Sequence, residues 1–218
     1  MKIVMVSDTH NKLDEIEIPE GDILLHAGDS TMMGRPEELH KFNQDLGKIK
    51  NRFTHGIVCI AGNHDWGFQR DSIRAQSYIT NATYLEDSFV IIEGKKIYGS
   101  PWTPFFFNWA FNLKRGKEIK EKWDLIPDDT DILITHGPPF GILDLVQNIS
   151  PYSNNQLISA GCEELLNRVV RLTNMKLNVF GHLHMNYGSK MIGNTNFVNA
   201  ACLNDSYKVA HAPIIYDI

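Results

Sequence analysis

Short apolar runs, rich in Ile, Val and Leu, recur along the chain and predict buried β-strands. The clearest are Ile3 to Val6, Ile23 to His26, Ile57 to Ala61, Phe89 to Ile92, Ile97 to Gly99, Ile132 to Thr135, Leu177 to Phe180 and Phe197 to Ala201. Near the C-terminus, Tyr207 to Ala210 and Ile214 to Tyr216 continue the pattern. Such short runs with many β-branched residues are typical of strands that are covered on both faces.

Between several of these runs, apolar residues spaced three or four apart predict amphipathic helices. The clearest segment runs from Pro36 to Lys50, with one apolar face formed by Leu39, Phe42, Leu46 and Ile49. Further helices are expected over Cys162 to Leu172 and around Trp123, and a hairpin over Val90 to Gly99. The pattern therefore indicates an α/β protein in which a mixed sheet, or a pair of sheets, is covered by helices.

Length and composition narrow this picture to one globular unit. The 218 residues are 43% hydrophobic and 22% charged, which fits a single domain over residues 1–218 and excludes disorder or coiled coil as the main architecture. A net charge of −5 gives no reason to expect strong binding to nucleic acid or to an anionic membrane. Three scattered cysteines and the absence of a long apolar stretch predict a cytoplasmic protein without disulfides.

The chemistry of the chain gathers where the predicted strands end. Asp, His or Asn residues, most of them beside a glycine, follow five of the apolar runs, in the segments Ser7 to His10, His26 to Asp29, Gly62 to Asp65, Thr135 to Gly137 and Gly181 to His184. In open α/β sheets, ligands bind at the carboxyl ends of the strands. We therefore expect these side chains to converge on one site.

Asp, His and Asn without Cys form a hard-to-borderline ligand set that suits Mn, Fe, Zn, Ni or Mg. The candidate ligands are too many for one ion that must keep an open position, so two ions that share a carboxylate fit better. Such two-metal centres serve in-line displacement at phosphorus, in which a hydroxide shared by the ions is the nucleophile. The sequence thus predicts a dinuclear site with two divalent ions, with Mn as the first candidate.

Five motifs occur in a fixed order: Asp8-x-His10, Gly28-Asp29, Gly62-Asn63-His64-Asp65, His136-Gly137 and Gly181-His182-x-His184. Together they resemble the calcineurin-like metallophosphoesterase superfamily, and the similarity extends over nearly the whole chain. The segments Gly21 to Asp29, Tyr98 to Trp102, Asn108 to Leu113 and Asp131 to Gly141 are most similar to its small metallophosphoesterase-domain (MPPED-like) branch. This resemblance implies a four-layer α/β/β/α sandwich with two facing mixed sheets and a metal site at the strand carboxyl ends.

The resemblance also implies a role for each motif residue. The first metal would take Asp8, His10 and His184, the second would take Asn63, His136 and His182, and Asp29 would bridge the two. His64 would lie over the phosphate, either as a donor to the transition-state oxygens or as the acid for the leaving group. Asp65 would hold the His64 imidazole in one orientation. His26, inside an apolar run, is expected to be a supporting or core histidine.

Aromatic residues supply the other unusual feature. The cluster Trp102, Phe105, Phe106, Phe107, Trp109 and Phe111 fits either a packed cap over the sheet edge or a wall of the substrate pocket. Phe140 lies in the proline-stiffened loop after His136, so it is the favoured candidate for substrate binding by stacking on a base.

These observations predict a metal-dependent phosphodiesterase that hydrolyses small phosphodiesters, with cyclic nucleotides as the favoured substrates. The alternatives are a phosphomonoesterase of broad specificity and a non-catalytic metal-binding interaction scaffold. A nuclease is disfavoured by the net charge of −5 and by the lack of a basic stripe. The expected partner is a small-molecule substrate, and no binding to a membrane is expected. The dense aromatic segment is also compatible with packing against a second copy of the chain in a homo-oligomer.

Overall fold

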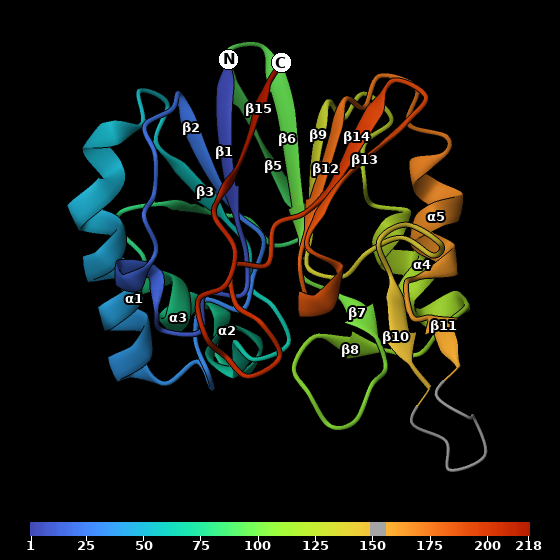
Figure 1. Ribbon diagram of the computed structural model, residues 1–218, viewed down its shortest axis with the longest axis horizontal. Coiled ribbons are helices and arrows are strands. Elements are labelled where there is room, and N and C mark those ends of the chain that lie inside the picture. The colour runs from blue at the N-terminus through green and yellow to red at the C-terminus, as the bar shows by residue number, and fades with distance from the viewer. Residues whose placement is uncertain (149–155) are drawn as a thin grey trace.

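A computed structural model describes residues 1–148 and 156–218 of the chain. The main elements form four layers, in the order helices, sheet, sheet, helices (Figure 1). This arrangement is the α/β/β/α sandwich with two facing mixed sheets that the sequence predicts.

The first sheet has the strand order β15-β1-β2-β3-β4. Its strands β1 to β4 are parallel and β15 pairs antiparallel with β1. The bounds are Lys2–Val6 for β1, Ile23–His26 for β2, Ile57–Cys59 for β3, Thr83–Tyr84 for β4 and Ile214–Asp217 for β15. On its outer face lie the helices α1 (Pro36–Ile49), α2 (Trp66–Arg70) and α3 (Ser72–Tyr78).

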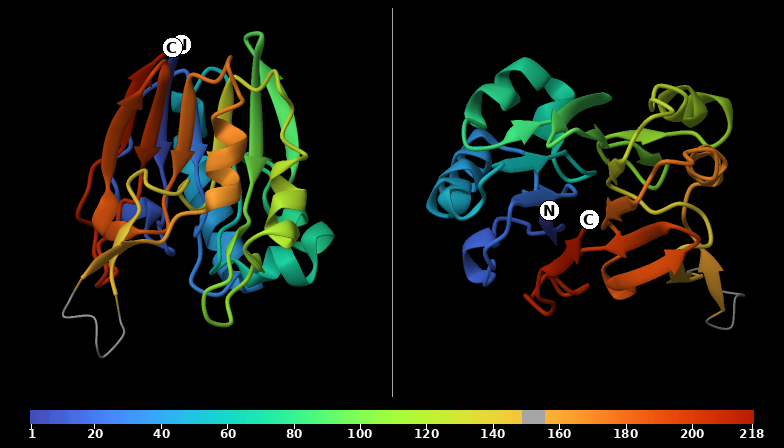
Figure 2. Two further views of the ribbon diagram at one scale, coloured as in Figure 1. Left: turned by 90° about the vertical axis from the view of Figure 1, so that its right-hand side faces the viewer. Right: turned by 90° about the horizontal axis from the view of Figure 1, so that it is seen from above.

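The second sheet has the order β13-β14-β12-β9-β6-β5. The inner strands β14, β12, β9 and β6 are parallel, and β13 and β5 pair antiparallel at the edges. The bounds are Ser88–Ile92 for β5, Lys95–Ser100 for β6, Ile132–Thr135 for β9, Leu177–Phe180 for β12, Gly188–Ile192 for β13 and Thr195–Asn199 for β14. Helices α4 (Lys117–Trp123) and α5 (Glu163–Val169) cover its outer face (Figure 2).

Several small elements complete the fold. Two short ribbons pair β7 with β8 and β10 with β11, and three 3₁₀ turns are present in the described chain. Their bounds are Thr103–Pro104, Asn112–Leu113, Leu145–Gln147 and Leu157–Ser159 for the strands, and Leu13–Glu15, Lys50–Arg52 and His184–Asn186 for the turns η1, η2 and η3.

The core explains why the strands are apolar on both faces. Ile3 and Met5 of β1 point into the layer between the sheets, where they join Ile132 and Val179 of the second sheet. The alternate residues of β1 and β2 pack under α1 and α3 instead. Each sheet therefore buries both of its faces, and its polar residues are left to the strand ends.

The local sequence determines where the predicted helices begin and end. Pro36 occupies the first turn of α1, and the Glu38 carboxylate accepts a hydrogen bond from the Arg35 amide at 2.9 Å. The predicted helix over Cys162 to Leu172 is shorter in the structure, because Cys162 is its N-cap and regular geometry ends at Val169. The longest helix, α1, has 14 residues, and the described chain contains none that is long and apolar enough to cross a membrane.

One predicted strand is wrong. Residues Tyr207 to Ala210 form no strand and instead follow a turn at Asp205 and Ser206, because the Asn204 side chain accepts hydrogen bonds from the Ser206 and Lys208 amides and Tyr207 adopts a positive φ of 55°. Only an isolated bridge between Leu203 and Val209 remains of the expected pairing. This turn brings Tyr207 to the site described below.

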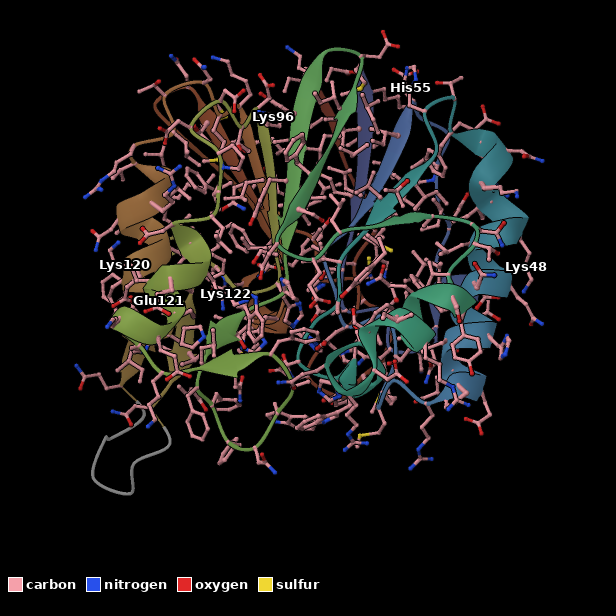
Figure 3. The ribbon with its side chains drawn as sticks, turned by 180° about the vertical axis from the view of Figure 1, so that it is seen from behind. Lys48, His55, Lys96, Lys120, Glu121 and Lys122 are labelled. Atoms are coloured by element: carbon pink, nitrogen blue, oxygen red, sulfur yellow. The ribbon has the colours of Figure 1, made fainter. Side chains whose placement is uncertain are left out.

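Several surface lysines form ion pairs with nearby aspartates. Figure 3 labels Lys48 on α1, Lys120 and Lys122 on α4, and Lys96 at the end of the sheets where the chain termini lie. Their ammonium groups contact the carboxylates of Asp45, Asp124, Asp87 and Asp129, respectively. These pairs leave no broad basic face on the elements that carry them.

Candidate metal centre and substrate pocket

The five motifs meet at one end of the two sheets. Asp8 follows β1, Asp29 follows β2, Asn63 follows β3, His136 follows β9 and His182 follows β12. A parallel bridge between Ser7 and Ala201 joins the ends of the two sheets, and the Ser7 amide donates to the Ala200 carbonyl at 2.8 Å. The predicted ligands from opposite halves of the chain therefore share one cluster.

The backbone is strained where it presents these side chains. Asp8, His10, Asp29 and His182 all have positive φ angles, between 39° and 67°. Such conformations are costly for residues other than glycine and concentrate at functional sites. The surrounding fold holds them in place, which indicates that side-chain direction matters more here than local stability.

Two motif glycines keep space open for the cluster. At Gly28, with φ at 99°, an added Cβ would lie 2.6 Å from the His136 ring nitrogen Nδ1. At Gly181 an added Cβ would overlap the Asp8 carboxylate and the Ser7 hydroxyl. Glycine is therefore required at both positions by the close approach of ligand side chains.

The first group contains Asp8, His10 and His184. Their candidate ligand atoms all lie within 4.8 Å of one another, and all three residues are buried. The His184 Nε2 is 3.3 Å from the Asp8 carboxylate. The three residues that the sequence assigns to the first metal thus lie together.

The second group contains Asn63, His136 and His182. The Asn63 carbonyl oxygen lies 2.9 Å from His136 Nε2 and 2.7 Å from His182 Nδ1. Three potential donor atoms therefore face a common point, as the sequence predicts for the second metal.

Asp29 lies between the two groups. One of its carboxylate oxygens is 3.3 Å from His136 Nε2 and 3.8 Å from His10 Nε2. The other accepts a hydrogen bond from the His64 amide at 2.8 Å. Because it reaches both groups, Asp29 has the placement that a bridging ligand needs.

The charges in the cluster favour ionised carboxylates. Burial would raise the pKa of Asp8 and Asp29, but His184 and His136 outweigh it and hold both pKa values well below their usual range. Burial opposes protonation of His136 and His184, yet the facing carboxylates raise their pKa to about 9. Burial lowers the pKa of His10 and His182 to about 4, so these rings are neutral.

Hydrogen bonds to backbone carbonyls fix three of the histidines. His10, His136 and His184 direct Nδ1 at the carbonyl oxygens of Thr31, Ala27 and Asn204, at 3.2, 2.9 and 3.1 Å. Because a carbonyl only accepts, Nδ1 carries the proton and Nε2 is turned toward the cluster. This is the orientation in which histidine binds a metal.

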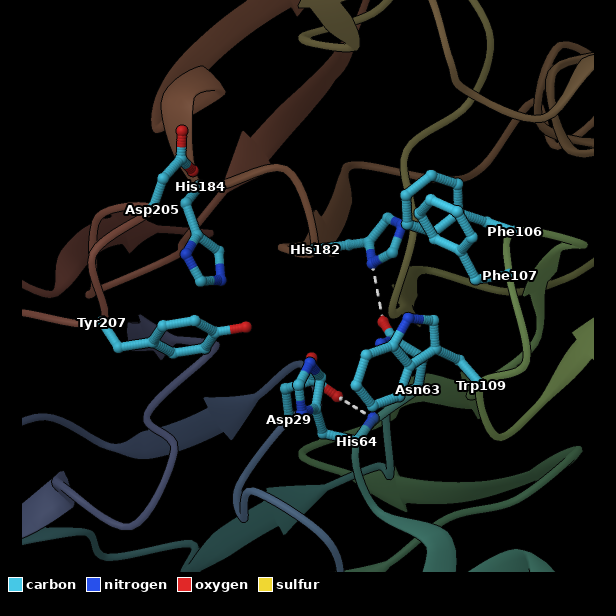
Figure 4. A pocket seen from close by; sticks show the side chains of 10 residues that line it. All are labelled: Asp29, Asn63, His64, Phe106, Phe107, Trp109, His182, His184, Asp205 and Tyr207. Atoms are coloured by element: carbon cyan, nitrogen blue, oxygen red, sulfur yellow. Dashed lines mark hydrogen bonds between the residues drawn. The ribbon is translucent and has the colours of Figure 1, made fainter. Parts of the chain in front are cut away.

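The cluster opens into a pocket of about 330 Å³ (Figure 4). Phe106, Phe107 and Trp109 stand on one side of it, and Tyr207, His184 and Asp205 stand on the other. Asp29, Asn63, His64 and His182 complete the lining. A volume of this size suits a small ligand more than a polymer.

Comparison with known proteins agrees with this geometry. A family model described as calcineurin-like phosphoesterase matches residues 1–186. The human protein metallophosphoesterase domain-containing protein 1 and its mouse counterpart are each 42% identical to this chain over 240 residues, covering 100% of this chain and 71% of theirs. The chain belongs to the calcineurin-like phosphoesterase family. It is therefore a metal-dependent phosphoesterase.

A solved structure supports the fold. Phosphopantetheinyl hydrolase from Mycobacterium tuberculosis aligns with a TM-score of 0.57 over 94% of this chain and 90% of that protein, at 15% sequence identity. At that identity the likeness extends to the fold alone.

The donor set fits the divalent metal that the calcineurin-like phosphoesterase family implies. His10 Nε2 is buried and, among the described residues, has no hydrogen-bond partner, which would be costly for a ring nitrogen without a ligand. A cation held by Asp8, His10, Asp29 and His184 would satisfy it. Asn63, His136 and His182, again with Asp29, would hold a second cation.

The three cysteines take no part in this site. Cys59, Cys162 and Cys202 are buried and unpaired, and burial raises the pKa of their thiols to about 12, 11 and 12.

His26 supports the site from outside, because it is fully buried and its Nε2 lies 2.9 Å from the Thr9 hydroxyl. Both observations agree with the structural roles expected from the sequence.

His64 stands beside the first group without the carboxylate partner that the sequence predicts. Its Nδ1 lies 2.9 Å from the Met32 carbonyl oxygen, and its ring is 4.2 Å from the Trp109 ring between centroids. Because this carbonyl can only accept a hydrogen bond, Nδ1 carries a proton. The other ring nitrogen, Nε2, takes no part in this hydrogen bond. Asp65 does not orient this imidazole, which corrects the expectation for Asp65.

The Asp65 carboxylate instead fastens two motif loops together. It accepts hydrogen bonds from the amides of Ser30, Thr31 and Gly62 at 3.2, 3.0 and 2.9 Å, and from both hydroxyls of Ser30 and Thr31. Burial, followed by the nearby Asp29 charge, raises the pKa of Asp65 to about 6. The acid thus holds the loops that follow β2 and β3, and so positions Asp29 and Asn63.

Replacing Asp65 with Asn should therefore destabilise the fold. An amide would turn a donor toward backbone N–H groups, so we expect a loss of about 2–4 kcal/mol, since hydrogen bonds to a charged acceptor are worth about 1.5–3 kcal/mol each. Urea unfolding in the presence of a chelator measures this loss without a contribution from metal binding. Asp128→Asn, at an exposed carboxylate, is the control and should change stability by less than about 0.5 kcal/mol. Unchanged stability in Asp65→Asn would contradict the role in fastening the loops.

Phe140 is not brought into the pocket. Its amide donates to the Cys162 carbonyl at 3.1 Å, and 37% of the residue is exposed away from the lining residues given above. The aromatic cluster divides instead: Trp102 and Phe111 pack in the core, whereas Phe106, Phe107 and Trp109 line the pocket. The sequence did not indicate that Tyr207 and Asp205 line the pocket. Turn-forming residues such as Asn204 and Ser206 were the signal that this segment is a loop.

Proposed function

We propose that this protein is a dinuclear phosphodiesterase that hydrolyses small phosphodiesters, with cyclic nucleotides as candidate substrates. The observation that carries the proposal is the Asp29 carboxylate, placed between two buried groups of candidate ligands at the base of an aromatic-walled pocket. Asp8, His10 and His184 would hold one divalent cation, and Asn63, His136 and His182 the other. Mn is the first candidate, with Fe, Zn, Ni or Mg as alternatives.

The bound cations would lower the pKa of water and neutralise the charge that develops on the phosphate oxygens. The protein supplies the rest. His64 in its protonated form, with Nδ1–H donating to the Met32 carbonyl, can donate its Nε2–H to a phosphate oxygen or to the oxygen of the leaving alcohol. Trp109 covers one side of the His64 ring, with the ring centroids 4.2 Å apart and the planes tilted by 30°.

Charge favours a diester over a monoester. Among the described residues, neither lysine nor arginine lines the pocket, while Asp29 and Asp205 do. A monoester carries a second negative charge that such a lining leaves without the paired donors an arginine would give. A diester with one charge avoids this cost, and the small pocket and net charge of −5 disfavour a nucleic acid.

The aromatic wall supports a planar group on the substrate. Phe106 and Phe107 contact each other edge-on, with ring centroids 4.4 Å apart, and both are largely exposed at the pocket. Stacking of a base on an aromatic ring is worth about 1–3 kcal/mol. These rings are better placed for stacking than Phe140.

A substrate panel tests this proposal. We expect 2′,3′- or 3′,5′-cyclic nucleotides to be cleaved with higher kcat/KM than p-nitrophenyl phosphate. Phe106→Ala should lower kcat/KM for the cyclic nucleotides about 5- to 100-fold, the range for one lost stack, and lower that for methyl p-nitrophenyl phosphate less. Phe140→Ala, an exposed phenylalanine outside the pocket lining, is the matched comparison.

The outcomes separate the rival functions. Faster cleavage of monoesters would make the protein a phosphomonoesterase of broad specificity, and no metal-stimulated turnover of any ester would favour the interaction scaffold. A larger loss in Phe140→Ala than in Phe106→Ala would return the stacking role to Phe140.

A further inference from the structure

A second hollow adjoins the substrate pocket. It encloses about 310 Å³ and is lined by His184, Met185, Asn204, Asp205, Ser206 and His211. His184 and Asp205 line both hollows, so the two adjoin at the first group of metal-binding residues. None of the five motifs includes the residues that follow His184 here.

The walls of this hollow are preformed. The Asn204 side chain accepts from the Ser206 and Lys208 amides at 3.0 and 3.1 Å, which fixes the turn that carries Asp205. His211 lies 3.0 Å from the Ala201 carbonyl through Nδ1, and its ring stacks on Tyr187 with centroids 4.2 Å apart. A ligand would therefore find the turn that carries Asp205 already formed, which lowers the entropic cost of binding.

Asp205 is the charged group of this hollow, and it is unpaired. Among the described residues no lysine, arginine or histidine forms an ion pair with it, whereas the lysines labelled in Figure 3 each meet an aspartate. No lysine or arginine in the described chain lines the hollow either. An open carboxylate beside a phosphate site repels a second anion and attracts a cation.

The two hollows meet at His184 and Asp205. In Figure 4 the Phe106 and Trp109 rings stand across the first pocket from these two residues. A phosphate bound in the first pocket could therefore carry one ester arm toward the aromatic rings and the other toward Asp205. An open-chain diester can fill both hollows, whereas both ester oxygens of a cyclic nucleotide belong to one ribose.

We propose that the hollow at Asp205 is a second subsite for one arm of an open-chain phosphodiester, and that the arm it selects is an alcohol bearing an ammonium group. This proposal rests on the phosphodiesterase function proposed above. Water attacks phosphorus, the P–O bond to the arm at the aromatic wall breaks, and that oxygen leaves with a proton as the free alcohol. The ammonium-bearing arm is retained as a phosphomonoester.

A pair of isosteric substrates isolates the charge. p-Nitrophenyl phosphorylcholine and p-nitrophenyl 3,3-dimethylbutyl phosphate have the same shape, and they differ by the replacement of the quaternary nitrogen with carbon. With the Mn²⁺-loaded protein, we expect kcat/KM for the choline ester to be about fivefold higher, the upper range for an exposed ion pair. Inhibition by phosphocholine and by 3,3-dimethylbutyl phosphate should show the same preference as a readout of binding alone.

Variants at Asp205 assign the preference to this residue. Asp205→Asn keeps the shape and removes the charge, so the ratio of the two kcat/KM values should fall to about one, and Asp205→Lys should reverse it. Asp124→Asn, which removes a carboxylate on the surface next to α4, is the matched control and should keep the wild-type ratio. Thermal unfolding of each variant confirms that the fold is retained.

The result also separates this proposal from the function on which it rests. Equal cleavage of the two esters, or a preference that Asp205→Asn leaves in place, would overturn the subsite and leave the phosphodiesterase intact. Failure to cleave either ester or any other diester would overturn the phosphodiesterase itself.

Discussion

Asp29→Ala should remove both metal ions at once. Its carboxylate is the group that lies within 4 Å of ring nitrogens from both ligand groups, through His10 and His136. Without it, each group loses a charged ligand, and the mutual repulsion of two nearby cations is no longer offset. We expect metal content to fall from two ions per chain to near zero and turnover to fall more than about 10³-fold, beyond the loss of a single stabilising donor.

Asn63→Ala provides the comparison that tests bridging. Asn63 contacts His136 and His182 but belongs to the second group alone, so its loss should reduce occupancy to about one ion per chain. Elemental analysis of Mn²⁺-loaded, gel-filtered protein gives the stoichiometry of each variant. Urea unfolding in a chelator should show that both variants still fold. One ion in the unmodified protein, or two ions retained in Asp29→Ala, would contradict the bridging role.

The strand pattern alone predicted covered sheets and a convergence of polar side chains at the strand ends, whereas the four-layer arrangement and the ligand assignment came from the resemblance to the calcineurin-like family. β-Branched apolar runs form buried strands, and a short strand delivers the residue after it to a defined edge of the sheet. Asp8, Asn63 and His136 each lie shortly after such a run, so their convergence required parallel strands within each sheet and the carboxyl ends of both sheets at one end of the molecule. Five such positions, read together, left few other arrangements.

The contacts between loops could not be predicted in the same way. Asp65 follows His64 in the chain, yet its side chain turns toward Ser30 and Thr31, where three backbone amides need an acceptor. The partner of His64 is the carbonyl of Met32, and a backbone carbonyl leaves no trace in the amino-acid sequence. Hydrogen bonds with main-chain groups therefore determine what both Asp65 and His64 contact.

The prediction of which aromatic residues line the pocket failed for a related reason. Phe140 follows the candidate ligand His136 closely, but its loop pairs with Cys162, and Phe140 is not among the residues that line the pocket. Tyr207 comes from the far end of the chain and reaches the site through a turn with a positive φ. Its apolar neighbours resembled a strand, because strand periodicity and a short apolar turn cannot be distinguished over four residues.

His64→Ala should retain both metal ions and lose most of the turnover. The ring lies 4.7 Å from the His10 ring between centroids, and its Nδ1 is held by Met32, so it is positioned at the first group but is tied to the backbone. A positioned acid or base contributes about 10²–10⁴-fold, and we expect kcat to fall by that factor. Elemental analysis is essential here, because His10, Asp29 and His64 also lie close enough together to hold an ion.

The leaving group distinguishes the two roles open to His64. If the imidazolium protonates the departing oxygen, His64→Ala should slow alkyl diesters far more than p-nitrophenyl diesters, since nitrophenolate leaves without a proton. If His64 instead donates to the phosphate oxygens of the transition state, both classes should slow by a similar factor, because those oxygens are common to both. His64→Gln, which can donate a hydrogen bond but cannot act as an acid at neutral pH, should restore activity in the second case alone. Loss of a metal ion from either variant would mean that His64 is a ligand and would overturn both roles.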